Sequence, residues 1–384
     1  MSQYTIPDRL FSQAAIQYCG FNQVQAARLW ERWEGIQREP DDHPAKVECT
    51  FLEILTCFIN DSNDVWIDND SAWTRCMEYW GIATEMQDAI MDKRFKRLRL
   101  TRTCVQWIHD TIELRYTGLE HFLQFTSCKD LCCDHSSALD LDQKSQDGLQ
   151  DTHRSSPPGY SGETLSPTMD IAPPGITVLY KATSESWVCH RISNPFLDPE
   201  GNLARVEALD TPPPSDFSAL SAMPYFATSL KTAHIHAAYL KRRGNRCQEV
   251  AVVRICIANA AFQSLNSAQL VQAYFPSDDW KKLVWHSKRS LPNKELLRFK
   301  GATVVVGSVA GKHDKVFQKL ESWKDVTEEH VSTIGAYEDG EPDVQYGFIS
   351  DDGSEFLGKH ATDIKVLPYS NEQYLQWMAE HKPE

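Results

Sequence analysis

A polar segment between about residues 135 and 175 divides this chain into two regions of different character. The segment is rich in Ser, Asp, Gln, Gly and Pro, and it contains the runs Ser155-Ser156-Pro157-Pro158-Gly159 and Pro173-Pro174-Gly175. A stretch with so few large apolar side chains cannot bury enough surface to offset the entropy lost on folding. We therefore expect a disordered linker or a long loop over 135–175. A chain of 384 residues is long enough for two domains, or for one large domain with an appendage.

The first region, residues 1–134, shows the apolar spacing of helices. Between about residues 22 and 126, apolar side chains recur every three or four residues, which places them on one face of a helix. One stripe comprises Val24, Ala27, Trp30 and Trp33, and a second comprises Val47, Phe51, Ile54, Leu55 and Phe58. We expect a small helical N-terminal domain.

In the second region, residues 176–384, short β-rich runs alternate with helices. Runs rich in Val, Ile and aromatic residues predict strands at 176–183, 250–257, 302–309 and 345–350. Residues 228–244 begin with a capping residue and end in basic residues and a glycine, which is typical of a helix. Two shorter helices are expected at 278–289 and 315–326. The predicted fold class is α+β, a helical N-terminal region followed by a mixed α/β catalytic region.

The charge balance restricts the classes of partner. Lys and Arg total 39 against 53 Asp and Glu, a formal net charge of −14. Affinity for phosphates depends on cations that release counterions, so this balance excludes a protein that coats nucleic acid but is compatible with one local basic patch. The start of the chain lacks a secretory signal, and no run approaches the roughly 18 apolar residues of a membrane span. We expect a soluble cytoplasmic protein whose 11 cysteines are reduced thiols.

Several familiar motifs are missing from the sequence. It contains no Gly-x-Gly-x-x-Gly, no His-Glu-x-x-His and no Gly-x-Ser-x-Gly. Residues 307–313 resemble a phosphate-binding loop, but they have one residue too few between the glycines and a histidine where Ser or Thr would hold magnesium. Cys128, Cys132, Cys133 and His135 are soft ligands, yet their spacing does not closely match a zinc site. We therefore expect neither a metal nor a cofactor.

A basic strip interrupts this otherwise acidic chain. Its six cations are Lys93, Arg94, Lys96, Arg97, Arg99 and Arg102. A strip with interleaved Phe and Leu is typical of a protein that contacts an RNA at one place, and the alternative is a solvated helix face or loop. A smaller cluster, comprising Lys241, Arg242, Arg243 and Arg246, could also contact phosphates.

A cluster of carboxylates directly follows the strand predicted at 345–350. Asp351, Asp352 and Glu355 form an Asp-Asp-x-x-Glu motif, and Gly353 within it predicts a turn. Carboxylates that project from the end of a strand suit a general base, and a pair of them can bind a planar guanidinium group. The alternative interpretation is a solvated acidic turn.

With this motif, the chain resembles the fungal arginine-containing cyclodipeptide synthases, a family with one Asp-Asp-x-x-Glu motif needed for activity. The resemblance extends to the blocks LYKATS (179–184), YFATSLKTAHIHAAYLKRR (225–243) and DDWKKLVWHSKR (278–289). It implies that Asp351, Asp352 and Glu355 are catalytic.

The resemblance also implies a reaction. Two aminoacyl-tRNAs, one of them arginyl-tRNA, are condensed to a cyclic dipeptide for secondary metabolism, and the synthase itself consumes no ATP. The basic strip of six cations would then contact tRNA. In the bacterial cyclodipeptide synthases a serine carries the first aminoacyl group, and Ser184 and Ser229 are the candidates for such a role here. The second amino acid is not indicated.

A second resemblance is to the ADP-ribosyltransferase-like fold. The opening strand with Tyr180, the run Tyr225 to Ser229 before a helix, and the later acidic Asp279 are similar to the elements that build an NAD cleft in that fold. Lys181 stands where Arg or His is expected, and no Glu-x-Glu occurs near a late strand. The alternatives are thus an NAD-dependent ADP-ribosyltransferase-like enzyme, or a non-catalytic interaction protein that uses the Trp-rich helical half. Candidate substrate-binding residues are Tyr180, Tyr225, Ser229 and Trp280, although the aromatic ones fit a core equally well.

Overall fold

The computed structural model describes residues 5–38, 49–133, 172–188, 196–245, 247–291, 294–335 and 340–382, with side chains to residue 124 in the long helix that ends at Cys133. Most of the linker expected at 135–175 lies outside the described residues. His135, one of the four soft ligands near residue 130, and Arg246 of the smaller basic cluster also lie outside the described residues.

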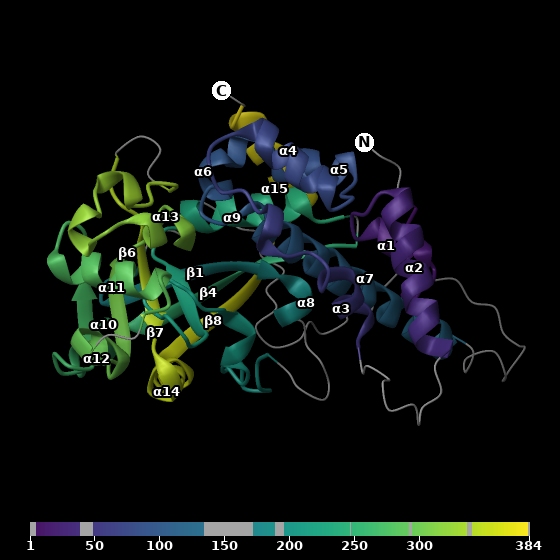
Figure 1. The fold of residues 1–384 in the computed structure, drawn as a ribbon. Coiled ribbons are helices and arrows are strands. Elements are labelled where there is room, and N and C mark those ends of the chain that lie inside the picture. The colour runs from purple at the N-terminus through teal and green to yellow at the C-terminus, as the bar shows by residue number, and fades with distance from the viewer. Residues whose placement is uncertain are drawn as a thin grey trace, which may run out of the picture.

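The N-terminal region is helical, as predicted. It lies beside and above the sheet in Figure 1. Its helices are α1 (Gln13–Tyr18), α2 (Gln23–Arg38), α3 (Phe51–Thr56), α4 (Asp70–Tyr79), α5 (Thr84–Ile90), α6 (Lys96–Arg99) and α7 (Cys104–Cys133), with the 3-10 turns η1 (Asp61–Asn63) and η2 (Lys93–Phe95).

The second region is built around one mixed sheet. Its strands are β1 (Ile176–Ser184), β2 (Asp210–Thr211), β3 (Met223–Ala227), β4 (Val250–Ala258), β5 (Leu270–Ala273), β6 (Val304–Ser308), β7 (Val344–Phe348) and β8 (Ala361–Pro368). Their order in the sheet is β5-β6-β7-β3-β1-β4-β8, with β2 paired to β3. The pairing is antiparallel except between β5 and β6.

Helices connect the strands and cover the sheet. They are α8 (Glu185–Val188), α9 (Leu230–Arg243), α10 (Asn259–Gln263), α11 (Asp278–Lys288), α12 (Leu297–Lys300), α13 (Asp314–Lys319), α14 (Ser350–His360) and α15 (Asn371–Glu380). Short 3-10 turns are η4 (Val206–Leu209), η5 (Lys294–Leu296), η6 (Trp323–Asp325) and η7 (Glu328–His330). The α+β fold class and the four predicted strands are confirmed, and the helix expected at 228–244 is α9.

Two local predictions are wrong. The helix expected over 315–326 is shorter, because α13 ends at Lys319 and Leu320 adopts an extended backbone (ψ 133°). The turn expected around Gly353 is instead the first part of α14, whose buried face comprises Gly353, Phe356 and Leu357. A glycine is required in this helix, because a Cβ at 353 would lie 2.5 Å from the backbone carbon of Phe348.

The sheet divides into two halves at its centre. β1 pairs with β4 over its whole length, from Ile176↔Ala258 to Ser184↔Val250. Its pairing with β3 is limited to Tyr180↔Ala227. The two strands therefore diverge beyond Tyr180, and the C-terminal half of β1 lacks a hydrogen-bonded neighbour on that side.

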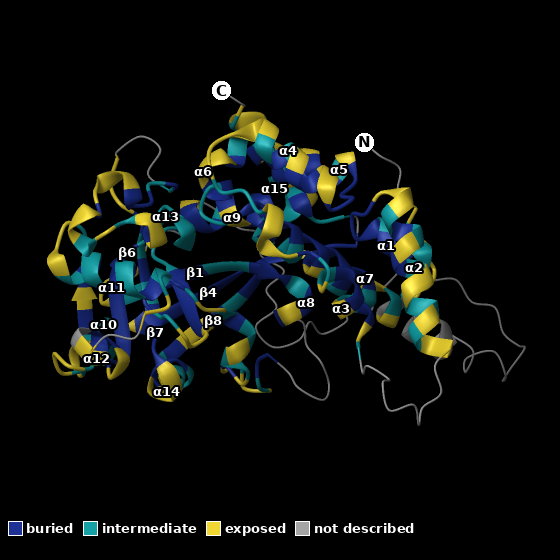
Figure 2. Cartoon of the chain, viewed as in Figure 1, coloured by how far each residue is buried: buried dark blue, intermediate teal, exposed yellow. Residues whose placement is uncertain are grey.

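The helical region and the sheet share one hydrophobic core. Buried residues of α4, α5 and α7 belong to the same cluster as Val178 and Tyr180 of β1 and residues of α9 and α15. Phe95 links the parts, since its ring stacks on Tyr239 of α9 at 4.8 Å and on Trp377 of α15 at 4.9 Å. Figure 2 shows buried, dark segments both in these helices and in the strands of the sheet. A second cluster, which includes Leu179, Phe226 and Phe356, fills the opposite face of the sheet.

Candidate functional site

A cavity of about 790 Å³ lies where β1 and β3 diverge, between the sheet and the helical region. Its walls come from the start of α7, the C-terminal half of β1, β2 with the prolines that follow it, β3, α9 and the end of α11. The volume falls within the roughly 300–1,000 Å³ typical of small-molecule sites. A cleft at a break in a sheet is well placed to be a site, because side chains from several rigid elements converge there.

Two helices each present one face to this cavity. On α7 the lining residues include Gln106, Asp110 and Glu113, and on α9 they include His236 and Arg243. Spacings of three, four and seven residues place such side chains on a common helix face. The α9 face is oriented by its cap, in which the Ser229 hydroxyl accepts a hydrogen bond from the backbone N–H of Thr232.

An Arg–Asp–Arg cluster forms the helical wall. The Asp110 carboxylate accepts hydrogen bonds from Arg102 at 2.8 Å and from Arg243 at 2.6 Å. Both guanidinium groups lie over the ring of Trp107, at 5.1 and 4.5 Å from its centroid. Burial alone would raise the pKa of Asp110, but the charges of Arg243 and Arg102 outweigh burial and lower it. The cluster therefore carries a net positive charge, and its Arg102 guanidinium is part of the cavity lining.

Lys181 lies opposite, on the diverging part of β1. Its Nζ donates to Thr211 Oγ1 at 3.2 Å and to the backbone carbonyl of Tyr225 at 3.3 Å. Burial lowers the pKa of Lys181 to about 8; the Asp210 carboxylate opposes this effect and the Arg102 guanidinium adds to it. A neutral amine is therefore accessible near physiological pH at this position.

Two carboxylates face the cavity with raised pKa values. Burial raises the pKa of Asp210. The positive charge of Lys181 opposes this rise, and the negative charge of Glu207 adds to it. Burial also raises the pKa of Glu113. The negative charge of Asp110 adds to this rise, and the positive charge of Arg102 opposes it. No described cation lies within ion-pair distance of either one, in contrast to Asp110. A cationic substrate group would stabilise the charged form of both carboxylates.

Other acidic residues of the lining are already paired. Asp216 forms an ion pair with Lys288 at 2.8 Å and accepts hydrogen bonds from the Ala310 amide at 2.8 Å and from Gln345 Nε2 at 2.7 Å. Asp343 accepts hydrogen bonds from the hydroxyl groups of Thr232 and Ser332. It also accepts hydrogen bonds from the backbone amides of Ile334 and Gly335. These groups hold the loops of the rim in place.

His236 and Ser184 complete the polar lining. His236 is exposed to the cavity, yet the protein walls around it lower its pKa to about 4 by desolvation; Asp343 opposes this, whereas Lys181, Arg102 and Arg243 contribute to the lowering. The imidazole is therefore neutral at pH 7. The Ser184 hydroxyl accepts a hydrogen bond from Gln248 Nε2 at 2.7 Å and lies 2.6 Å from the Ser186 hydroxyl.

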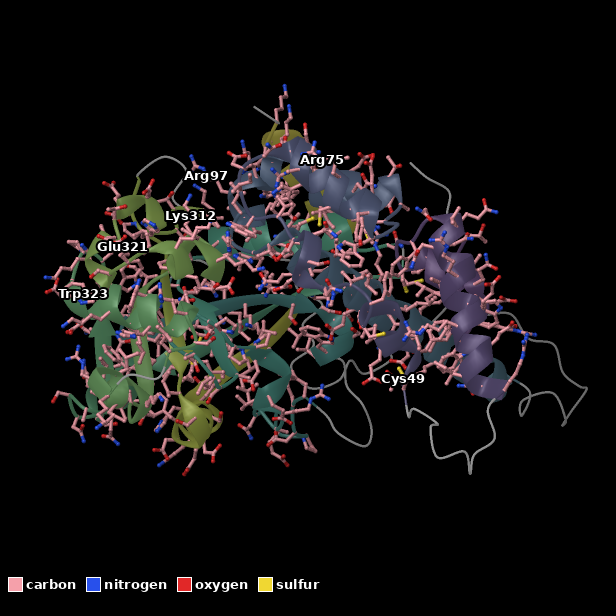
Figure 3. The ribbon with its side chains drawn as sticks, viewed as in Figure 1. Cys49, Arg75, Arg97, Lys312, Glu321 and Trp323 are labelled. Atoms are coloured by element: carbon pink, nitrogen blue, oxygen red, sulfur yellow. The ribbon has the colours of Figure 1, made fainter. Side chains whose placement is uncertain are left out.

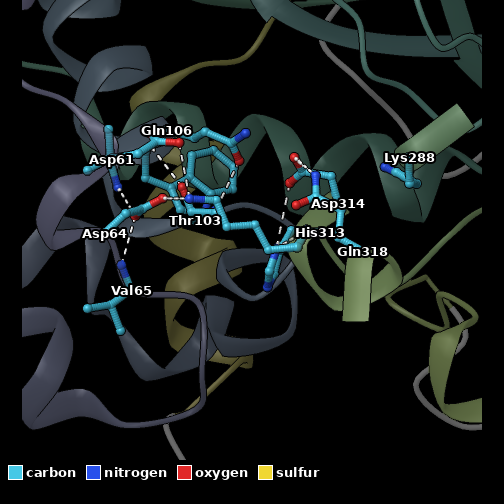
Figure 4. Close-up of polar contacts among 12 residues, drawn as sticks. Asp61, Asp64, Val65, Thr103, Gln106, Lys288, His313, Asp314 and Gln318 are labelled. Carbon is cyan, nitrogen blue, oxygen red and sulfur yellow. Dashed lines mark hydrogen bonds and ion pairs between the residues drawn. The ribbon is translucent and has the colours of Figure 1, made fainter. Parts of the chain in front are cut away.

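The helical region also contacts helix α13 of the second region (Figure 4). Lys315 of α13 donates to Asp61 at 3.1 Å and to Asp64 at 3.2 Å. Asp64 in turn accepts from the backbone amides of Val65 and Val105, at the start of α7. Burial alone would lower the pKa of Lys315, but the bonds to Asp61 and Asp64 raise it. This contact fixes the start of α7 relative to α13 and thereby the width of the cavity.

The Asp-Asp-x-x-Glu motif lies outside the cavity. Asp351, Asp352 and Glu355 are exposed on the first turns of α14. The helix packs on the cluster that contains Leu179 and Phe226, which is the face of the sheet opposite α9. The three carboxylates are thus near one another, but no cavity-lining residue is among them.

Most of the basic strip is engaged in internal ion pairs. Arg99 is 1% exposed and pairs with Asp70 at 2.6 Å, and Arg102 belongs to the cavity wall. Arg94 pairs with the buried Asp92 at 2.7 Å, and Lys96 with Asp68 at 2.9 Å. An interpretation of all six cations as one phosphate-binding surface is therefore wrong for Arg99, whose charge is buried.

Lys93 and Arg97 are exposed. Arg97 and Lys312 lie close together in Figure 3 and line a groove of about 640 Å³. The groove shares Ser332 and Ile334 with the cavity, so the two are adjacent.

The described members of the second basic cluster also form ion pairs within the protein. Arg242 pairs with Asp92 at 2.9 Å, Lys241 with Glu249 at 3.3 Å, and Arg243 with Asp110. For Arg242 and Arg243 the reason is the packing of α9 against the helical region, which brings the last turn of α9 beside acidic residues far away in the sequence.

The four candidate substrate-binding residues separate into two pairs. Tyr180 and Tyr225 line the cavity, although the Tyr225 hydroxyl is already bonded to Ser215 at 2.7 Å and to the Phe217 amide at 2.9 Å. Ser229 is the cap of α9 and does not line the cavity. Trp280 is fully buried and donates to the Ser308 carbonyl at 2.7 Å, so its role is in the core.

The residues that matter most in the cavity were not singled out as candidates from the sequence. Lys181, Asp110, Glu113 and Asp210 belong to no short motif, and their partners are distant in the chain. A signal did exist for Lys181 and His236, because both fall within the blocks that carry the resemblance. A single charged residue in an otherwise apolar strand such as β1 is the feature that sequence reasoning could have used.

Comparison with protein-family models found no match, and comparisons with curated proteins and with solved structures found no significant similarity. Among the described residues, no group of three or more His, Cys, Asp or Glu side chains could hold a metal ion. None of the helices in the described part of the chain has the length and apolarity needed to cross a membrane. The seven cysteines whose side chains the structure describes are all free thiols.

Proposed function

We propose that this chain is a tRNA-dependent cyclodipeptide synthase that condenses arginine with a second aminoacyl group in the cavity between α7, α9 and β1. One observation carries the proposal. The three blocks that resemble the fungal arginine-containing synthases are separated by up to about a hundred residues, yet all three contribute to the lining of one cavity. They supply Lys181, His236 and Lys288, respectively.

The chemistry of the cavity supports acyl transfer between two amino acids. The reaction needs a site that excludes water, since an aminoacyl ester is otherwise hydrolysed, and that holds two reacting groups together. A cavity of about 790 Å³ lined by cationic and anionic side chains has room for both reacting groups. The ester bond already carries the activation, which is consistent with a sequence that lacks a nucleotide-binding motif.

The unpaired carboxylates suit the arginyl group. Glu113 and Asp210 have no described cation within ion-pair distance, and each prefers its charged form once a cation binds. A guanidinium group binds carboxylates through two parallel hydrogen bonds, which lysine cannot reproduce. The positive Arg102–Asp110–Arg243 cluster, on the same helical wall as Glu113, would stabilise the oxyanion that forms when an ester carbonyl is attacked.

The groove beside the cavity suits the tRNA end. Arg97 and Lys312 line it, together with Glu328 and Glu329. It adjoins the cavity at Ser332 and Ile334. A single-stranded 3′ terminus that followed this groove would bring its ester to the cavity. The catalytic roles of Asp351, Asp352 and Glu355 remain the prediction that the family resemblance implies, and these residues lie at a surface separate from the cavity.

The test is the product itself. The chain is expressed in a bacterial host, and cell extracts are searched by mass spectrometry for diketopiperazines that contain arginine and are missing from the empty-vector host. Asp210→Asn should reduce the product at least tenfold, because it weakens the guanidinium contact. Asp88→Asn, at an exposed position of α5 outside the cavity lining, is the matched control and should leave the yield unchanged.

A negative result has a defined meaning. If neither extracts nor purified protein supplied with arginyl-tRNA and mixed aminoacyl-tRNAs yields such a product, the proposal fails. Incubation of the same protein with NAD tests the ADP-ribosyltransferase-like alternative, in which the diverging β1 and β3 would border the NAD cleft. Consumption of NAD with no diketopiperazine would favour that alternative.

A further inference from the structure

Lys181 is a partly buried amine of the cavity lining that no carboxylate in the described part of the chain neutralises directly. Within the described residues, no Asp or Glu oxygen lies within 4.0 Å of its Nζ, and its hydrogen-bond partners are one hydroxyl and one carbonyl. Long charged side chains in protein interiors are normally paired, because an unpaired buried charge is costly. A lysine left in this state at the lining of a large cavity is a candidate for chemistry rather than for stability.

The groups that face Lys181 come from each element around it. Asp210 on β2 favours its charged form, whereas Arg102 ahead of α7 disfavours it. His236 on α9 lies close enough to interact with it, but that ring is neutral at pH 7. β3 contributes only a carbonyl, and Val253, the register partner on β4, is apolar. The balance leaves Lys181 with a pKa of about 8, more than two units below an ordinary lysine.

We propose that Lys181 is the general base that deprotonates the attacking α-ammonium group of the second aminoacyl substrate, an inference that rests on the proposed function. The neutral Lys181 amine takes one proton from the α-ammonium group. The resulting α-amine attacks the carbonyl carbon of the first ester, so that a C–N bond forms and the C–O bond to the tRNA ribose breaks. The second proton lost by the nitrogen goes to the ribose oxygen. Lys181 then releases its proton to water and is neutral again.

The proton affinities match this role. The α-amino group has an ordinary pKa of about 7.7–8.0, so proton transfer to Lys181 is close to thermoneutral. His236 is too weak a base, because its pKa is about 4. Lys288 is engaged in an ion pair with Asp216 at 2.8 Å. The other imidazole of the lining, His109, is engaged by the Ile59 carbonyl at 3.1 Å. Among the described amines and imidazoles of the cavity lining, Lys181 therefore fits best.

The first arm of the test needs no substrate and uses the intact wild-type protein. Lysines are labelled with trace acetic anhydride between pH 6 and 11, and each acetylated peptide is quantified by mass spectrometry. The labelling of Lys181 should reach half its maximum near pH 8. Free Nα-acetyl-lysine added to the same mixture, whose amine has the ordinary pKa of about 10.4, should do so about two units higher. A Lys181 curve that coincides with the curve of the free amine would overturn the inference.

The second arm measures diketopiperazine formation from purified aminoacyl-tRNAs. Lys181→Met removes the base, and Lys181→Arg keeps a cation that cannot act as a base; both should lose 10²- to 10⁴-fold in rate, the usual contribution of a general base. The wild-type rate should rise with pH to a plateau above about 8. The deficit of Lys181→Met should be largest below pH 8 and shrink above it, because the α-amino group of the substrate is by then neutral without help from a base. Ethylamine in solution should restore part of the activity of Lys181→Ala. Lys300→Met, at an exposed position of α12, is the matched control and should retain the wild-type rate.

The outcomes separate the inference from the function on which it rests. If the wild-type protein forms the product and Lys181→Arg remains within tenfold of it, Lys181 is not the base but the proposed function stands. If the wild-type protein forms no product from any aminoacyl-tRNA, both fall. Loss of activity in both variants, together with a pH profile that follows the labelling of Lys181, would support both.

Discussion

The Arg102–Asp110–Arg243 cluster allows a quantitative prediction. Asp110→Asn removes the only carboxylate that either arginine contacts among the described residues, at 2.8 and 2.6 Å. Arg243 is only 2% exposed and keeps just the Thr111 hydroxyl, at 3.0 Å, and its ring contacts. Removing one partner from a buried ion pair usually costs 3–5 kcal/mol. Because Asp110 itself is 27% exposed, we expect a loss near the lower limit, about 3 kcal/mol.

The measurement is urea unfolding, followed through tryptophan fluorescence. With a slope of about 3 kcal/mol/M, the loss shifts the unfolding midpoint by about 1 M. Asp68→Asn is the matched control, since it breaks an ion pair with Lys96 in which both side chains are about half exposed, and it should cost less than about 1 kcal/mol. Equal shifts of the unfolding midpoint in the two variants would refute the reasoning, because the cost of breaking an ion pair would then not depend on its burial.

The same variant should respond differently to acid. The folded pKa of Asp110 is lowered, whereas an unfolded aspartate titrates near about 3.9. The carboxylate therefore contributes stability that is fully present above about pH 4 and is lost as the pH falls through the lower, folded pKa. The difference in stability between the wild-type protein and Asp110→Asn should be constant from pH 5 to 7 and shrink below pH 4. A difference that persists undiminished to pH 2 would contradict the assignment.

Two further substitutions test the packing around the cavity and α14. Tyr225→Phe should destabilise the fold by about 1–3 kcal/mol, because the buried amide of Phe217 loses its hydrogen-bond acceptor; a neutral change in the unfolding midpoint would show that water replaces the hydroxyl. Gly353→Ala should also be destabilising, by about 1–3 kcal/mol, since the new Cβ meets the backbone of Phe348 at 2.5 Å and the Thr303 carbonyl at 2.8 Å. The gain in helix propensity that alanine normally brings, up to about 1 kcal/mol, would dominate only if α14 could move away from the sheet.

Local sequence patterns were sufficient for most of the secondary structure. The Val- and Ile-rich runs became β1, β4, β6 and β7, because such residues suit a buried sheet. α9 begins after its Ser229 cap and ends in basic residues before Gly244, as its sequence indicates. The prediction failed at 351–355, where a glycine was interpreted as a turn. Its actual cause is a close approach of α14 to the backbone of Phe348, which no local pattern records.

The sequence by itself determined an acidic chain with a helical first region, an α+β second region and a basic strip. Only the tertiary structure decided what the charges do. Arg99 pairs with Asp70, 29 residues away in the sequence, and Arg243 pairs with Asp110, 133 residues away. Cations that the sequence places in a basic strip or cluster are therefore largely paired with carboxylates of the same chain. Likewise, Lys181 becomes a perturbed amine only because β1 and β3 diverge beside it. Helices and strands follow from neighbouring residues, whereas burial and ion pairing depend on residues that folding brings together.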